Sequence, residues 1–147
     1  MHYLFLLLAF LTGIAISIQA GVNSNLRLTL NNPLLASLIS FGTGFFTLLV
    51  VHLSTGGALP PLATLRSLAW WKWTGGIIGA AYVTTVILAV PRIGTANLVS
   101  LSVAGQLLAA IVLDHYGLLG FAQHPANSWR LLGMGLILAG VWLVVKN

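Results

Sequence analysis

An uncharged stretch between Arg92 and Asp114 constrains the fold of this chain more than any other part of it. Residues 93–113 read IGTANLVSLSVAGQLLAAIVL and carry no ionisable side chain. As an α-helix rising about 1.5 Å per residue, this stretch spans roughly 30 Å, which is the thickness of the hydrocarbon layer of a bilayer. It is apolar on most sides, whereas a surface helix of a soluble protein is apolar on one stripe only. It therefore predicts a transmembrane helix.

The composition of the whole chain agrees with a membrane location. Of the 147 residues, 59% are hydrophobic and 5% are charged, whereas about a quarter of an ordinary soluble domain is charged. The mean hydropathy is +1.02. We therefore expect an all-α fold, a single domain over residues 1–147 that forms a bundle of five transmembrane helices. The five predicted spans are residues 3–20, 34–53, 73–90, 93–113 and 131–145, with a very short turn at Pro91 and Arg92 between the third and the fourth.

A cleaved signal peptide is the alternative interpretation of residues 3–20. A signal peptide begins with positive charge and ends at small residues. Here only His2 precedes the apolar run as a basic residue, and Ile18 stands at the third position from its end. We therefore interpret the run as a membrane span. The second span is expected to begin at Asn32 and Pro33, because a capping side chain followed by proline favours a helix start.

The basic residues do not indicate a nucleic-acid partner. The net charge is +5 and the pI is about 10.5, but the cations lie singly between apolar runs and form no basic stripe. They are Arg27, Arg66, Lys72, Arg92, Arg130 and Lys146. Lys72 stands within the sequence WWKW, which is typical of an anchor among lipid headgroups.

Catalysis and metal binding lack the residues that they need. Asp114 is the one acidic residue, so the sequence holds no carboxylate pair for general acid–base chemistry. There is no cysteine, and the four histidines are scattered near span ends or in loops without the spacing of metal ligands. We therefore expect no enzymatic activity, no cofactor and no metal.

The cations are balanced across the membrane. Five spans place the two termini on opposite sides, and each side then holds three cations. On the side of the N-terminus lie Arg66, Lys72 and Arg130. On the far side lie Arg27, Arg92 and Lys146. Because an excess of Lys and Arg in cytoplasmic loops sets orientation, this balance favours insertion both ways. Two opposite copies form an antiparallel ten-helix homodimer, an inverted repeat as in many transporters. A fixed orientation, tipped by Asp114 or the N-terminal amine, is the alternative.

Polar residues share one face of the first span. Thr12, Gln19 and Asn23 follow one another at spacings of seven and four, which bring side chains to the same side of an α-helix. An uncharged amide both donates and accepts hydrogen bonds, which suits a neutral or zwitterionic solute. We predict that this face binds substrate; alternatively, the amides bond neighbouring helix ends. A similar face of the second span consists of Ser37, Ser40, Gly44 and Thr47.

The fourth span carries polar residues on two sides. Asn97 and Gln106 are nine residues apart, so at about 100° per residue they lie on opposite faces. Ser102 groups with Gln106. We predict that one face lines the transport pathway, with Gln106 favoured, and that the other contacts a neighbouring helix. Interhelical hydrogen bonding is the alternative role for both amides.

Other residues are candidates for structural contacts. Gly13 with Ser17, and Gly75 with Gly79, are pairs of small residues one helical turn apart, which favour close helix approach. Asp114 is expected at the membrane surface, where an ion pair with Arg130 is less costly than a charge at the bilayer centre.

Four segments of the chain resemble those of the bacterial YdcZ-type family, a five-span branch of the drug/metabolite transporter superfamily. The segments read QAGVNSNLR, NNPLLASLISFGTG, VTTVILAVPRIGTANLVSLSVAGQLLAAIVLDHYGLLG and SWRLLGMGLILAGVWLV, and the resemblance as a whole covers nearly the whole chain. The resemblance implies an inner-membrane exporter, and short members that act as dimers, some with dual topology. It names no substrate. The four-span multidrug members carry a membrane-embedded glutamate in the first helix; this chain has none there, which puts proton coupling by a buried carboxylate in doubt.

Together these observations predict a small transporter, an exporter of an organic solute, in the bacterial inner membrane. We expect it to work by alternating access as a dual-topology homodimer. Its expected partners are the lipid bilayer, an unidentified small solute and a second copy of the chain. The alternative is a membrane scaffold that transports nothing, or one half of a hetero-dimeric transporter.

Overall fold

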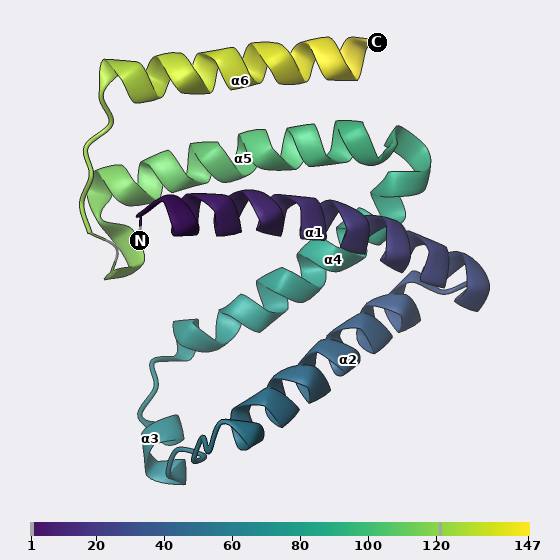
Figure 1. The fold of residues 1–147 in the computed structure, drawn as a ribbon, viewed down its shortest axis with the longest axis vertical. Helices are drawn as coiled ribbons and strands as arrows, with labels where there is room; N and C mark the ends of the chain where they lie inside the picture. Colours follow the sequence, from purple (N-terminus) through teal and green to yellow (C-terminus); the bar gives the residue numbers. More distant parts are fainter. Residues whose placement is uncertain (1, 121) are drawn as a thin grey trace. The chain divides into compact units, whose positions relative to one another are not determined.

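The computed structural model describes residues 2–120 and 122–147, which are helical apart from short connections (Figure 1). In chain order the elements are α1 (His2–Leu30), α2 (Pro33–Ser54), α3 (Leu62–Arg66), η1 (Trp70–Trp73), α4 (Thr74–Ile93), α5 (Thr95–Tyr116), η2 (Leu118–Gly120) and α6 (Ser128–Lys146). Within the described residues, five helical segments are long and apolar enough to cross a membrane: α1, α2, η1 with α4, α5 and α6. The prediction of an all-α fold with five long apolar helices is confirmed.

The first helix is longer than the predicted span. α1 continues beyond residue 20 to Leu30, because no proline interrupts residues 21–30. Its 29 residues extend over roughly 44 Å, which exceeds the hydrocarbon layer and leaves the polar end with Arg27 at the membrane surface. The helix ends where Asn31 adopts a left-handed conformation (φ 50°), which asparagine tolerates better than most residues.

The tight turn after α1 starts the second helix as predicted. Asn32 is extended, and its side-chain Oδ1 accepts hydrogen bonds from the backbone N–H groups of Leu34 (3.0 Å) and Leu35 (3.1 Å). Pro33 occupies the first helical position, where its missing N–H costs nothing. The capping prediction at Asn32 and Pro33 is confirmed.

The helices divide into two compact units, with residues up to Arg92 in the first and residues from Ile93 in the second. In the first unit α1 packs against α2. α2 also meets α4, because Ser37 Oγ lies 2.9 Å from Thr84 Oγ1. In the second unit α5 packs against α6.

Just after this boundary, Gly94 has φ 80°, a backbone conformation that favours glycine. The turn predicted at Pro91 and Arg92 falls slightly later in the chain, because both residues belong to the last turn of α4. Pro91 has no N–H to donate to the carbonyl oxygen of Ile87, so the helix lacks one backbone hydrogen bond near its end.

Small side chains form the buried parts of α1 and α2, whereas large apolar side chains lie on the outside. The buried residues of these two helices are Ala20, Asn23, Ser24, Ala36 and Ser37. Transmembrane helices approach closely through small residues, since lipid tails are as apolar as leucine and give no hydrophobic drive for packing. Exposed leucine, isoleucine, valine and phenylalanine along the long helices suit contact with lipid.

Candidate functional site

A groove lies between α1 and α2 in the first unit. The two helices meet at the turn after Leu30 and diverge from there (Figure 1). The hollow between them has a volume of about 630 Å³ and is lined from both sides. Its lining residues are Gln19, Val22, Asn23 and Leu26 of α1 and Ile39, Ser40, Thr43, Gly44, Thr47 and Leu48 of α2. We refer to this hollow as the α1–α2 groove.

An apolar hollow adjoins the α1–α2 groove. It measures about 370 Å³, and it shares Gln19, Ser40, Gly44 and Leu48 with the groove. Phe41 and Phe45 complete its lining. The site therefore has a polar part with amides and hydroxyls and an apolar part with two aromatic rings.

Two of the substrate candidates on the first span lie in this groove and one does not. Gln19 and Asn23 line it. Thr12 lies outside the lining, and its hydroxyl donates to the carbonyl oxygen of Leu8 in its own helix (2.8 Å). The face predicted on the second span also reaches the groove, through Ser40, Gly44 and Thr47.

Hydrogen bonds within α2 use the protons of two threonines. The Thr43 hydroxyl donates to the backbone of its own helix, at 3.0 Å from Ile39 O and 2.9 Å from Ser40 O. The Thr47 hydroxyl donates to Thr43 O at 2.8 Å. Each of these oxygens keeps lone pairs, so both threonines offer acceptors to a molecule in the groove.

The two amides of α1 differ in exposure. Asn23 is buried, with 5% of its surface exposed, whereas Gln19 is exposed. Neither amide is hydrogen-bonded to another group within residues 2–120 and 122–147. In the same residues, every fully buried side-chain nitrogen or oxygen has a hydrogen-bond partner. The amide atoms of Asn23 have none, so they are not fully buried and belong to the accessible part of the residue. Those atoms are therefore open to a ligand or to water in the groove.

The candidates on α5 lie in the second unit and line neither hollow. Gln106 is exposed, and Asn97 and Ser102 are half-buried. Their contact with substrate stays a prediction. Thr43, Phe41 and Phe45 are site residues that the sequence patterns did not single out. Thr43 follows Ser40 by three residues and precedes Thr47 by four, and this helical spacing is the signal that identifies it.

The small residues predicted to be packing positions differ in what surrounds them. A Cβ added to Gly79 meets the ring of Phe41 at 3.5 Å, so α4 approaches α2 at this point. Within the described residues, a Cβ added to Gly13 or Gly75 meets nothing within 4 Å. Ser17 donates its hydroxyl proton to Gly13 O at 3.1 Å. Packing roles for Gly13, Ser17 and Gly75 stay predictions.

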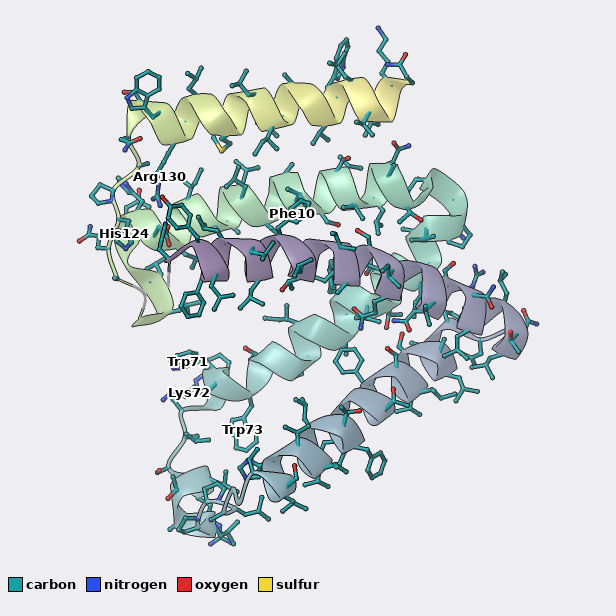
Figure 2. The ribbon with its side chains drawn as sticks, in the orientation of Figure 1. Phe10, Trp71, Lys72, Trp73, His124 and Arg130 are labelled. Atoms are coloured by element: carbon teal, nitrogen blue, oxygen red, sulfur yellow. The ribbon has the colours of Figure 1, made fainter. Side chains whose placement is uncertain are left out.

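A polar cluster joins α5 to α6 in the second unit. Arg130 Nη2 donates to Asp114 Oδ2 at 3.2 Å, and Arg130 Nη1 donates to the carbonyl oxygen of His124 at 3.1 Å. The backbone N–H of His124 donates to the carbonyl oxygen of Asp114 at 2.8 Å. Figure 2 shows Arg130 and His124 together where α5 and α6 are connected.

Further hydrogen bonds hold the same connection. His115 Nδ1 accepts from the backbone N–H of Ala126 at 3.1 Å, and Gln123 Nε2 donates to His115 O at 2.9 Å. A hollow of about 250 Å³ lies beside Asp114 and Arg130, and its other lining residues are apolar except for a glycine. Because both charges have partners in the cluster, this end of the bundle is best explained as a structural connection.

We expect the Asp114–Arg130 pair to contribute modestly to stability. The two side chains are 32% and 40% exposed, and exposed ion pairs contribute about 0.2–1 kcal/mol. A double-mutant cycle with Asp114→Asn and Arg130→Gln should give a coupling energy in this range. The measurement is unfolding by SDS in mixed micelles, followed by circular dichroism. Arg130→Gln alone should destabilise more than Asp114→Asn, because it also removes the bond to His124 O. A coupling energy of zero would mean that the pair contributes nothing to stability.

The tryptophans before α4 form a second interfacial feature. Figure 2 shows Trp71, Lys72 and Trp73 at the start of this helix. Lys72 Nζ lies 5.7 Å from the centre of the Trp71 ring, within the range of a cation–π contact. Indole rings beside a lysine suit the headgroup layer.

Five long apolar helices, with large apolar side chains exposed along them, define a multi-pass helical membrane protein. The chain belongs to the YdcZ family, described as "Putative inner membrane exporter, YdcZ", whose pattern it matches over residues 4–143. It is 26% identical over 144 residues to "Inner membrane protein YdcZ" of Escherichia coli (strain K12), covering 97% of this chain and 96% of that protein. No solved structure matches the chain.

The family result confirms the resemblance drawn from the sequence. It also confirms a multi-pass protein of the inner membrane, together with the five long apolar helices. Membership of a family of exporters favours transport over catalysis. Among the described residues, no group of three or more His, Asp or Glu side chains is placed to hold a metal ion.

Proposed function

We propose that the protein exports an organic solute that binds in the α1–α2 groove. The observation that carries this proposal is the groove itself, in a chain of an exporter family. Two helices long enough to cross the bilayer form it, and they turn amides and hydroxyls toward a hollow of about 630 Å³. Polar groups within a bilayer are costly and mark solute pathways when they face a cavity. The volume is in the range of pockets for small molecules.

The working unit in this proposal is an antiparallel homodimer with dual topology. Each cation lies in a helix end or in a short segment between long helices, as expected for the membrane surfaces. Five spans assign three cations to each side, so neither orientation is favoured. Two inverted copies supply the two-fold symmetry that allows alternating access, because one half exchanges conformations with the other around a shared site.

Transport by the purified chain tests the proposal. The protein is reconstituted into liposomes loaded with a mixed panel of neutral, cationic and anionic aromatic solutes, and efflux of each is followed by mass spectrometry. We expect at least one solute to leave faster than it leaves loaded liposomes that contain no protein. A folded protein that moves no member of a broad panel argues for a scaffold. Transport that appears only when a second, related chain is added argues for half of a hetero-dimer.

A further inference from the structure

We propose that the solute of the α1–α2 groove is uncharged, with an amide-like or hydroxyl head that both donates and accepts hydrogen bonds and an aromatic body. This inference rests on the proposed function and specifies the substrate class of the same site. It follows from three observations: the amide of Asn23, the absence of charge in the lining, and the phenylalanines of the adjoining hollow.

Asn23 indicates the head of the solute. It is buried, with 5% of its surface exposed, lines the groove and has no hydrogen-bond partner among the described residues, yet its amide atoms remain accessible. Its Nδ2 offers donors and its Oδ1 accepts. Gln19 supplies a second amide, and Thr43 supplies lone pairs because its proton is already used. A head group that makes use of these groups must itself both accept and donate.

The lining excludes charged solutes. Every residue around the α1–α2 groove and its adjoining hollow is uncharged. A cation or an anion moved there from water loses its hydration and finds no opposite charge, which is a large penalty in a site of low dielectric constant. A zwitterion carries two charges, and each of them loses its hydration in the same way. The neutral solute is therefore favoured over the zwitterion, although an amide face alone suits either.

The apolar hollow indicates the body of the solute. Phe41, Phe45 and Leu48 line it, and it shares Gln19 and Ser40 with the polar groove. The two hollows are therefore adjacent, and the proposed solute holds its head among the amides and its body among the rings. Aromatic side chains prefer offset or edge-to-face contact with another ring, which favours an aromatic body over an aliphatic one.

Binding of three matched probes to the full chain in lipid nanodiscs tests the proposal. The probes are 2-naphthamide, 2-naphthoate and 2-naphthylmethylammonium, which share a ring system and differ in the charge of the head. Equilibrium dialysis at pH 7.4 measures each affinity. We expect saturable binding of 2-naphthamide and at least roughly tenfold weaker binding of both ions. Equal or tighter binding of either ion would overturn the assignment.

Variants locate the head in the groove. Asn23→Leu keeps the approximate size of the side chain and removes its polar atoms, so we expect about a tenfold loss of 2-naphthamide affinity. Asn25→Leu is the matched control, since Asn25 is exposed on the same helix and lies outside the lining. If Asn23→Leu does not fold, Ser40→Ala replaces it, with an expected loss of about threefold. Unchanged affinity in a folded Asn23→Leu or Ser40→Ala protein would contradict the proposed head site.

The outcomes separate this inference from the proposed function. Binding of 2-naphthamide by a protein that moves no member of the solute panel supports the substrate class and contradicts the transport proposal. Transport of ionic solutes, with no preference for the amide, supports the transport proposal and contradicts the substrate class.

Discussion

We expect Gly44→Trp to abolish solute efflux from liposomes while the protein stays folded. Gly44 lines both the α1–α2 groove and the adjoining apolar hollow. A tryptophan there places a large ring where the solute binds. We expect efflux to fall to the level of loaded liposomes without protein, because the ring occupies space in both parts of the site.

The substitution is tolerated by the backbone. A Cβ added to Gly44 meets nothing within 4 Å, so the new side chain begins in open space. Glycine in the middle of a helix is about 1 kcal/mol less favourable than alanine, so replacing it does not weaken α2. Circular dichroism and gel filtration of the purified variant measure whether it remains folded.

Gly42→Trp is the matched control. Gly42 lies two residues away in α2, a Cβ added to it also meets nothing within 4 Å, and it lines neither hollow. We expect this variant to retain efflux. Full transport by Gly44→Trp, or equal loss in both variants, would show that the α1–α2 groove is not the solute site.

We expect two added lysines on one side of the membrane to fix the orientation of the chain. Asn25→Lys with Asn147→Lys adds a cation near the end of α1 and one after α6, which raises the count on that side from three to five. Thr64→Lys with Ala122→Lys does the same on the other side. All four residues are exposed. Because the side richer in Lys and Arg stays in the cytoplasm, each pair should shift the ratio of orientations about tenfold, in opposite directions.

Reporters fused to the C-terminus measure this shift. One reporter is active only in the cytoplasm and the other only in the periplasm. The natural chain should activate both, and each lysine pair should activate one. A natural chain that activates a single reporter has a fixed orientation, which removes the support for an antiparallel dimer.

Co-expression then tests the dimer itself. If two inverted copies form the transporter, either lysine-fixed variant alone should transport at background level. The two together should recover transport, because each supplies the orientation that the other lacks. Transport by one fixed variant alone would mean that a single orientation suffices. A neutral control with glutamine at the same four positions should behave like the natural chain.

The number and type of the helices were predictable from the sequence because the bilayer leaves few alternatives. A run of membrane length without charge must satisfy its backbone within a helix. The capping pair Asn32 and Pro33 was equally readable, since a cap depends on neighbouring residues only. The end of α1 was less predictable from the sequence. Residues 21–30 are polar enough for a surface segment, and only local backbone geometry shows that the helix continues to Leu30.

The sequence by itself determined five apolar helices, the cap of the second helix and the helical faces on which Gln19, Asn23, Ser40 and Thr47 lie. Only the tertiary structure decided that these faces meet in one groove, that Thr12 is left out, and that Phe41 and Phe45 join them. The reason is that periodicity belongs to a single helix, whereas a site depends on which helices pack together. In a membrane that choice follows from small residues at close contacts and not from the total hydrophobicity of a run.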